Sequence, residues 1–365
     1  MRPHGLALGT GEERRLVAGA SPCDDLAGED RRVYAMTLRR QGSISSHPLD
    51  RVELRDPEPG RGEIRLRIRA CAICRTDLHV IEGDLPPHRM PLVPGHQAVG
   101  VVDRLGPGCR RFHPGDRAGI AWLRGTCGAC EFCRSGAENL CEASRYTGYD
   151  DDGGYAELAV VPEAFAYPIP PAFPDLDAAP LLCAGIIGYR ALGRTELARG
   201  GRLGLYGFGS SAHVVLQIAR HRGTEVFVAT RGARHREFAR RLGAAWVGDA
   251  TATMPGRLDA AIVFAPAGEI VPPALRAVRK GGVVVLAGIH MSPIPAMEYG
   301  PHLFHEKTLR SVEANTRRDG DDLLREAAEI PIRPSVTTFP LEAANEALSD
   351  LKADRLDGTG VLVVA

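Results

Sequence analysis

The sequence has no excess of either charge, because its 45 lysines and arginines equal its 45 aspartates and glutamates. A nucleic-acid-binding protein usually carries a clear basic excess, so this balance argues against that class. The sequence also lacks an apolar run near the roughly 18 residues that a membrane helix needs. The apolar core of a signal peptide is missing, because Glu12, Glu13, Asp24 and Asp25 interrupt the first residues. We therefore expect a soluble, cytoplasmic protein without nucleic-acid or membrane partners.

Hydrophobic residues make up 44% of the 365 residues and charged residues 25%, which is typical of a globular chain. At roughly 150 residues per domain, the length favours two domains. The nine cysteines are an odd number in a long chain, which does not fit a small secreted disulfide scaffold. In a reducing compartment, clustered thiols indicate metal ligands rather than disulfides.

The pattern of apolar residues changes along the chain. Residues 1–31 lack apolar periodicity, and we expect a flexible tail there. From residue 32 to about 168, short runs such as EIRLRIRA alternate with Gly and Pro turns, which predicts a mostly β domain.

After about residue 176, nearly continuous apolar runs such as EVFVAT alternate with helical patterns such as SAHVVLQIARHR. This alternation predicts an α/β domain with a doubly wound parallel sheet. In this part we expect VPPALRAVRKGG to be a helix that stops at its glycines. From about residue 321 we expect two helices, DDLLREAAE and LEAANEALSDLKA, and a last strand, GVLVVA.

Four cysteines lie within fifteen residues, namely Cys127, Cys130, Cys133 and Cys141. Two-residue spacers allow a tight loop to aim successive thiolates at one point, about 2.3 Å from a zinc ion. Iron–sulfur clusters use similar spacings, and buried structural cysteines are a third interpretation. Zinc fits best, and with four sulfur ligands it would stabilise the loop without an open position for catalysis.

A second candidate metal site is dispersed along the sequence. Cys74 opens CRTDLH, His96 lies in PGHQ, and Cys183 lies in LLCAG. Two thiolates and one imidazole leave the fourth zinc position free for a substrate oxygen. The spacing alone does not show that these residues converge, and each of them singly is more often a core residue. Cys71 and Cys109 have no accompanying polar residues, so we assign both to packing.

The segment GLYGFGSSAH contains Gly207-x-Gly209-x-x-Ala212 between a predicted strand and a predicted helix. Glycines permit a tight turn and the close approach of a pyrophosphate, and the helix N-terminus offers N–H groups and a positive dipole end. Such a motif is often only a turn. At the first strand–helix junction of a βαβ unit, however, it favours dinucleotide binding.

Together these motifs resemble, in order and spacing, the zinc-dependent medium-chain alcohol dehydrogenases. The resemblance covers about residues 33–365 and implies two domains. A GroES-like, mostly β catalytic domain would span 32–185, with a zinc lobe at about 124–142, and 321–365 would complete it. A Rossmann cofactor domain would occupy 186–320.

The resemblance also implies roles for individual residues. It makes Cys74, His96 and Cys183 ligands of a catalytic zinc and the four clustered cysteines ligands of a structural zinc. It implies that the Thr76 hydroxyl takes the alcohol proton, that His79 is a relay histidine, and that the Asp77 carboxylate orients His96. It makes Trp122 a wall of the alcohol pocket. The implied contacts to the cofactor are Arg75, Gly207, Gly209, Ala212, Thr230, Arg231 and Gly288.

The sequence departs from the family pattern at three places. Gln97 stands where many relatives have Glu, which leaves the site one charge less negative. Thr230 and Arg231 stand where NAD-preferring members carry an acidic residue, which favours NADP(H) over NAD(H) slightly. The final strand, DGTGVLVV, lacks the basic residue that many relatives place against the cofactor phosphates.

The implied activity is reversible hydride transfer between a zinc-bound primary or secondary alcohol and NAD(P)⁺, with two zinc ions per chain. Zinc as a Lewis acid would lower the pKa of the alcohol. Three alternatives remain: a dehydrogenase tuned to a polyol or sugar, a non-catalytic NAD(P)-binding redox sensor, and a four-cysteine iron–sulfur electron carrier. A homodimer or homotetramer is expected. Leu85, Pro86, Pro87 and the segment AGIHMSPIP are expected to shape the pocket.

Overall fold

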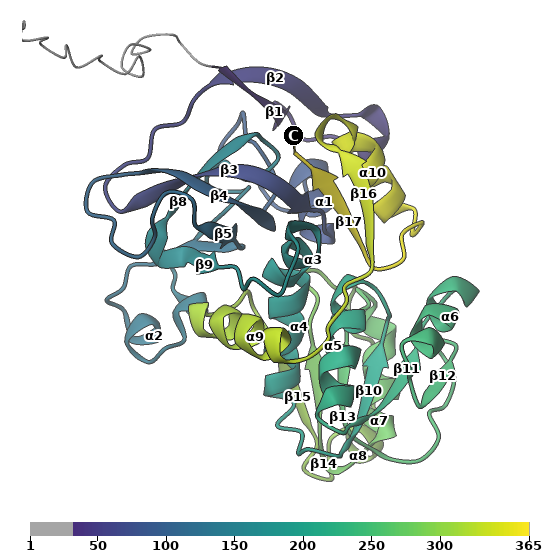
Figure 1. Cartoon of the computed structure of the whole chain (residues 1–365). Coiled ribbons are helices and arrows are strands. Elements are labelled where there is room, and N and C mark those ends of the chain that lie inside the picture. Colours follow the sequence, from purple (N-terminus) through teal and green to yellow (C-terminus); the bar gives the residue numbers. More distant parts are fainter. Residues whose placement is uncertain (1–31, 365) are drawn as a thin grey trace, which may run out of the picture. The chain divides into compact units, whose positions relative to one another are not determined.

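The computed structural model describes residues 32–364 (Figure 1), and the tail expected for residues 1–31 lies outside the described residues. The first sheet contains β3 (Glu63–Ala72), β4 (Ala98–Leu105), β5 (Arg117–Ile120), β8 (Leu158–Pro162), β9 (Ala166–Pro168), β16 (Val336–Pro340) and β17 (Thr359–Val363). Its strand order is β16-β17-β3-β4-β5-β9, and β8 also pairs with β3. The C-terminal strands, yellow in Figure 1, therefore complete a sheet that begins in the N-terminal half.

Smaller elements accompany this sheet. Two antiparallel pairs are β1 (Arg32–Leu38) with β2 (Leu49–Arg55), and β6 (Leu123–Gly125) with β7 (Arg145–Tyr146). The helices are α1 (Arg75–Glu82), α2 (Glu131–Arg134), α3 (Asp175–Ala178) and α10 (Ala344–Lys352). Helix α1 follows β3 directly, and α2 lies inside the four-cysteine segment.

The second sheet is parallel throughout. Its strands are β10 (Arg202–Tyr206), β11 (Glu225–Ala229), β12 (Trp246–Gly248), β13 (Leu258–Val263), β14 (Val278–Leu286) and β15 (Thr308–Ser311). The order is β12-β11-β10-β13-β14-β15, so the chain leaves β10 on one side and returns to its other side. A ligand crevice is expected at the carboxyl end of β10, where the winding direction reverses.

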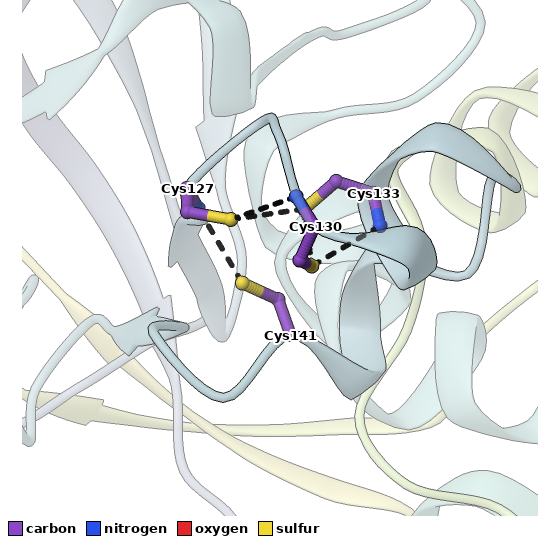
Figure 2. A group of neighbouring side chains, drawn as sticks. All are labelled: Cys127, Cys130, Cys133 and Cys141. Carbon is purple, nitrogen blue, oxygen red and sulfur yellow. Dashed lines mark hydrogen bonds between the residues drawn. The ribbon is translucent and has the colours of Figure 1, made fainter.

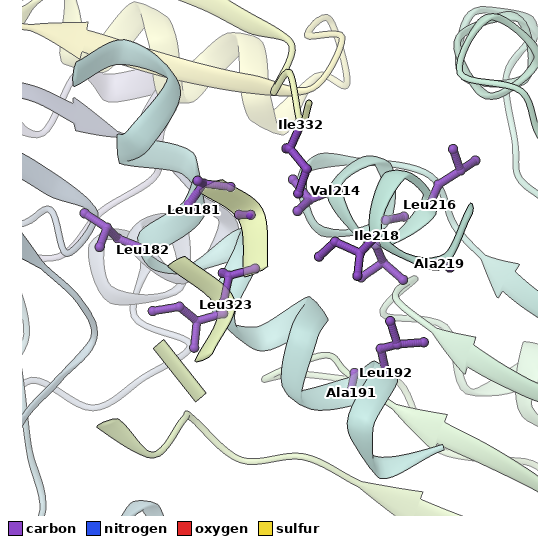
Figure 3. Packing of buried hydrophobic residues seen from close by; sticks show 14 of the residues in the cluster. Leu181, Leu182, Ala191, Leu192, Val214, Leu216, Ile218, Ala219, Leu323 and Ile332 are labelled. Atoms are coloured by element: carbon purple, nitrogen blue, oxygen red, sulfur yellow. The ribbon is translucent and has the colours of Figure 1, made fainter. Parts of the chain in front are cut away.

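The helices of this half are α4 (Ala184–Arg194), α5 (Ser210–His221), α6 (Ala233–Arg241), α7 (Val271–Ala277), α8 (Tyr299–His302) and α9 (Arg317–Glu329). Apolar side chains of α4, α5 and α9 form one buried cluster (Figure 3). Leu181 and Leu182, which directly precede Cys183, belong to the same cluster. Their burial fixes the backbone on which Cys183 is carried.

The segment VPPALRAVRKGG differs from its prediction. Helix α7 ends at Ala277, and β14 begins at Val278. The register of β14 against β13 shifts between Leu258 and Ala260, and Gly281 has a φ of +69°. Gly281 therefore lies in a β-bulge inside β14 and does not end helix α7.

Helix α4, which is mostly buried, and the short strands β12, β15 and β16 were not predicted from the sequence. Helix α9 begins at Arg317, earlier than the predicted start at residue 321. Its N-cap, Thr316, accepts the N–H of Asp319, whose carboxylate in turn accepts the Thr316 N–H. This capping box starts the helix before the apolar pattern becomes visible.

Within residues 32–364, no single helix is long and apolar enough to cross a membrane. One helix pair, Asp175–Leu182 with Ala184–Arg194, passes the same test by length and composition, with a 47° bend between its halves.

Candidate active site

Cys74 is held by the start of helix α1. It is the N-cap of that helix, and its sulfur accepts the Thr76 N–H at 3.3 Å. The Asp77 carboxylate accepts the Cys74 N–H at 2.8 Å, which closes a capping box. The sequence Cys-Arg-Thr-Asp therefore both begins the helix and fixes the cysteine sulfur at its N-terminus.

The structure brings Cys74, His96 and Cys183 together, although up to 109 residues separate them along the chain. His96 Nε2 lies 3.2 Å from Cys74 Sγ and 3.3 Å from Cys183 Sγ, and all three ligand atoms lie within 4.8 Å of one another. His96 stands just before β4, and Cys183 stands just before α4. Two sulfurs and one nitrogen at these separations suit a zinc ion with a fourth position open.

The charges in this cluster also fit a cation. Burial raises the pKa of the Cys74 thiol, but hydrogen bonding with Cys183 and the charge of His96 outweigh it, so the pKa falls well below its ordinary value. Burial likewise lowers the pKa of His96, but the charges of Cys74 and Asp77 outweigh it and raise the pKa to about 10. Without a metal, a proton on His96 compensates the negative charge of Cys74 and Asp77. A divalent cation can take over that role.

The four clustered cysteines also converge (Figure 2). Cys133 Sγ lies 3.9 Å from Cys127 Sγ and 3.5 Å from Cys130 Sγ, and all four sulfurs lie within 4.8 Å of one another. Four sulfurs about 2.3 Å from a zinc ion would be about 3.8 Å apart, so the donor set fits that metal. The N–H groups of Ala129 and Cys130 donate to Cys127 Sγ and lower the pKa of that thiol to about 6.

A cavity of about 910 Å³ opens beside Cys74 and Cys183 and extends to the carboxyl end of β10. His96 and Asp77 do not line it but lie buried behind Cys74, at 1% and 2% exposure. The other residues singled out from the sequence line the cavity, namely Arg75, Thr76, His79, Trp122, Gly207, Gly209, Ala212, Thr230, Arg231 and Gly288.

Two family models match the sequence: the alcohol dehydrogenase GroES-like domain over residues 60–171 and zinc-binding dehydrogenase over residues 212–329. The chain is 52% identical over 337 residues to the Probable alcohol dehydrogenase AdhA of Mycobacterium tuberculosis (strain CDC 1551 / Oshkosh). That match covers 91% of this chain and 97% of the relative. The chain belongs to the zinc-dependent medium-chain alcohol dehydrogenase family.

Solved structures agree with this family. A cinnamyl alcohol dehydrogenase from Sorghum bicolor superposes with a TM-score of 0.82 at 27% identity, over 91% of this chain and 98% of that one. A protein of Sinorhizobium meliloti 1021, assigned as a zinc-binding dehydrogenase and bound to NADP, gives 0.81 at 26% identity, over 91% and 99%. The predicted GroES-like and Rossmann architecture is confirmed, and the relatives support an oxidoreductase that acts on alcohols.

In this dehydrogenase, Gln97 bridges two parts of the Cys74–His96–Cys183 cluster. It is fully buried, its Nε2 donates to the Ala72 carbonyl, and its Oε1 accepts the Ala184 N–H, both at 3.4 Å. Ala72 precedes Cys74 by two residues, and Ala184 follows Cys183. An ionised glutamate could only accept, so the Ala72 carbonyl would lose the hydrogen bond that Gln97 donates. The Gln97 amide can both donate and accept, so its two hydrogen bonds link the segment that carries Cys74 to the segment that carries Cys183.

The final strand of this dehydrogenase contacts the start of α5, just after the Gly207-x-Gly209 turn, through two hydroxyls. Thr359, in β17, is buried, and its hydroxyl is hydrogen-bonded to the hydroxyl of Ser210 at the start of α5. The strand that lacks a basic residue thus contacts the helix N-terminus after Gly209. Sequence analysis missed this contact, because nothing in the pattern pairs Ser210 with a residue 149 positions away.

Trp122 forms part of an aromatic wall that the sequence did not reveal. Its ring lies edge-on to His96 at 4.9 Å and stacks on Tyr146 at 4.9 Å and on Tyr149 at 5.9 Å. Of the predicted pocket-shaping residues, Leu85 and the first part of AGIHMSPIP line the cavity, whereas Pro86 and Pro87 do not. His290 lies in that segment and lines the cavity, but the sequence pattern did not single it out.

Asp77 orients His96 through a bond of 3.0 Å between its carboxylate and Nδ1–H. Burial raises the pKa of Asp77, although the charge of His96 opposes this effect. Because such a partner holds the ring of a metal-binding histidine, we expect Asp77→Asn to weaken zinc binding or turnover by about 10- to 100-fold. Metal content and kinetics of the purified variant measure this, and wild-type values for both would contradict the role.

Proposed function

We propose that the protein is a zinc-dependent alcohol dehydrogenase that interconverts a primary or secondary alcohol and its aldehyde or ketone with a nicotinamide cofactor. One observation carries this proposal: the Cys74–His96–Cys183 cluster borders the same cavity as the Gly207–Gly209 turn. A metal site with an open position and a dinucleotide-binding turn then face one space, as hydride transfer between an alcohol and a nicotinamide requires.

The chain's own residues hold and move the proton. A zinc ion held by the cluster would supply a Lewis acid that lowers the pKa of the alcohol. Thr76 and His79 are three residues apart on α1, so both side chains point to the same side of the helix and into the cavity. We assign Thr76 as the hydroxyl that takes the alcohol proton and His79 as the histidine that passes this proton toward solvent.

The cofactor end of the cavity is electrically suited to phosphates. The lining of the whole cavity contains three lysine or arginine side chains and three histidines against two carboxylates, namely Arg75, Arg231, Lys352, His79, His235 and His290 against Glu313 and Asp354. Gly207 has a φ of +88°, and a Cβ there would lie 2.9 Å from the Ala265 nitrogen, so glycine is required. The N-terminus of α5 follows this turn and offers free N–H groups to a pyrophosphate.

We further propose that NADP(H) is preferred over NAD(H). Within residues 32–364 the Arg231 guanidinium has no hydrogen-bond or ion-pair partner, while Arg236 is paired with Asp249. The N-cap of α6, Gly232, offers no side chain to the first N–H groups of that helix. An exposed, unpaired arginine beside a free helix N-terminus suits a 2′-phosphate.

Arg231→Ala is therefore expected to raise the KM for NADP about 10- to 100-fold while changing the KM for NAD little. A charge-assisted hydrogen bond to phosphate is worth about 1.5–3 kcal/mol, which gives this range. Arg240→Ala is a matched control, because Arg240 lies on α6, the helix that follows Arg231, and pairs with Glu237. Equal losses for both cofactors would refute the 2′-phosphate role.

The substrate end favours an apolar alcohol over a polyol or sugar. The Tyr149 hydroxyl donates to the Pro86 carbonyl at 2.6 Å, and the Tyr146 hydroxyl accepts from Ser144 at 2.8 Å. With these hydroxyls engaged inside the protein, Trp122 and the two tyrosines offer mainly ring surface to a substrate. A polyol would leave several hydroxyls without partners against such a wall.

We also propose a second, structural zinc in the four-cysteine segment and a homodimer or homotetramer. The exposed Tyr299 and Phe304, at 66% and 60% exposure, support the oligomer, because they lie in the segment of chain that leads to β15, the edge strand of the parallel sheet. Large exposed aromatic side chains beside an open sheet edge are typical of association surfaces.

Turnover of purified protein tests the proposed function. Linear, branched and aromatic alcohols and aldehydes are assayed with NAD(H) and NADP(H) in both directions, with a polyol and a sugar as comparisons. We expect turnover of apolar alcohols and aldehydes with higher kcat/KM for NADP(H). Cofactor binding without turnover of any substrate would favour a non-catalytic redox sensor.

A further inference from the structure

We propose that Asp84 is a positioning residue of the proton relay, which holds the ring of His79 so that Nε2 faces the cavity and provides the route from His79 to solvent. This inference rests on the proposed function, because it concerns the path of the alcohol proton.

The contact between the two side chains is direct. His79 Nδ1 lies 2.7 Å from the Asp84 carboxylate, and an ionised carboxylate can only accept a hydrogen bond. The proton of the neutral ring is therefore on Nδ1, and Nε2 carries the lone pair. Since His79 lines the cavity, Nε2 is the nitrogen available to accept a proton from a cofactor hydroxyl.

The turn that carries Asp84 is held firmly. Helix α1 ends at Gly83, which has a φ of +94°, and the Leu85 N–H donates to the His79 carbonyl at 3.1 Å. The side-chain amide of Gln41 donates to the carbonyls of Val80 and Leu85, at 2.7 and 2.8 Å. The backbone that carries Asp84 is thus held against the helix that carries His79.

Charges around the pair favour an ionised Asp84. The hydrogen bond from His79 holds the pKa of the Asp84 carboxyl below its usual range, and the charges of His79, His290 and Lys352 act in the same direction. The His290 ring lies 5.5 Å from that of His79, and Lys352 is itself paired with Glu82. Each of these groups faces the pair from a different segment.

The different exposure of the two side chains indicates the direction in which the proton moves, from His79 to Asp84 and then to water. The side chain of His79 is 16% exposed, whereas that of Asp84 is 52% exposed. One partner therefore borders the cavity and the other reaches water. A proton accepted at Nε2 leaves a positive ring next to a carboxylate, and the Nδ1 proton can pass to Asp84 and then to water. The ring is then neutral again but carries its proton on Nε2, so it must regain the Nδ1–H form before the next turnover, when Nδ1 takes a proton from water through Asp84 and Nε2 releases its own to water.

The test uses single-turnover alcohol oxidation near pH 7 with saturating cofactor, which separates proton and hydride transfer from product release. We expect Asp84→Asn to lower this rate about 10-fold and Asp84→Glu to restore most of it. Glu346→Gln is the matched control, because Glu346 is an exposed carboxylate beside His47 and outside the cavity. Its rate should equal that of the wild type.

A comparison in the His79→Ala variant separates a purely structural effect of Asp84 from an effect that acts through His79. In His79→Ala, adding Asp84→Asn should cause no further loss, because Asp84 acts through His79. A 10-fold loss in both backgrounds, or a wild-type rate for Asp84→Asn, would overturn the proposal.

Nuclear magnetic resonance of the cofactor-free protein gives a readout apart from activity. We expect the ring nitrogens of neutral His79 to show the Nδ1–H form, and the Asp84 carboxyl to titrate at higher pH in His79→Ala than in the wild type. The Nε2–H form, or an unchanged Asp84 titration, would overturn the pairing. If the wild type turned over no alcohol, the proposed function would fail, and this measurement would still report on the pair.

Discussion

Cys74→Ser is expected to lower alcohol turnover on the order of 1,000-fold while leaving the fold and cofactor binding intact. Serine is a good N-cap, so its hydroxyl can still accept the Thr76 N–H and begin helix α1. The change thus removes a metal ligand but not a helix cap. Lewis-acid stabilisation is worth several kcal/mol, and each 1.36 kcal/mol is tenfold in rate, which gives this magnitude.

The measurement is the steady-state rate and the dissociation constant for NADPH, with Cys109→Ser as the control. Cys109 is half-buried, its thiol contacts the Glu63 carbonyl, and it belongs to neither cysteine cluster. Its substitution should leave turnover within about twofold. Near-normal turnover of Cys74→Ser at full zinc occupancy would show that the Cys74–His96–Cys183 cluster is not the catalytic metal site.

Cys130→Ser is expected to act on stability, with the midpoint of thermal unfolding falling by about 10 °C. Cys130 is the N-cap of α2, and serine can again keep that cap. The change therefore tests the metal site of the four cysteines and not the helix start. Losing one of four ligands removes much of the contribution that a structural metal makes to folding.

The effect should also reach the cavity. Within the same segment, Asn139 donates to the Glu313 carbonyl at 2.8 Å, and the Glu138 carboxylate accepts from Arg317 at 3.1 and 3.2 Å. Glu313 and Asn315 line the cavity, so loosening the four-cysteine segment is expected to raise the substrate KM. Calorimetry with and without a zinc chelator measures the stability change. A Cys130→Ser midpoint equal to that of Cys74→Ser would contradict separate structural and catalytic sites.

The alternation of strands and helices after residue 176 could be predicted because each central strand is buried on both faces. Runs such as those of β10, β11 and β13 are nearly continuous in apolar residues, which is typical of parallel sheets. Strand β15 (TLRS) is short and half-exposed, and only its pairing with β14 identifies it. The bulge at Gly281 likewise depends on register with β13, which the local sequence does not contain.

The proposed metal ligands could be recognised only as parts of motifs. The four clustered cysteines have a local spacing that predicts a shared site, whereas Cys183 in an apolar run is indistinguishable from a core residue. What brings Cys183 to His96 is the packing of Leu181 and Leu182 into the α4–α5–α9 cluster, a contact between distant segments. Family resemblance supplied what spacing could not.

The contact between Asp84 and His79 could not be predicted from the sequence pattern. It lies five residues after His79, which is not a spacing that places two side chains on one face of a helix. The pair forms because the helix stops at Gly83 and the left-handed turn directs the chain back toward His79. The aromatic wall of Trp122, Tyr146 and Tyr149 was invisible for a similar reason, since β6 and β7 must pair before the rings can stack.

The most direct test of the central claim is the zinc content of the purified wild type, Cys74→Ser and Cys130→Ser, measured by plasma emission on preparations assayed for turnover. We expect about two zinc ions per chain in the wild type and about one in each variant, with turnover abolished in Cys74→Ser. A wild type that turned over alcohols with no zinc, or that kept two zincs in Cys74→Ser, would contradict the claim that Cys74, His96 and Cys183 hold the catalytic metal.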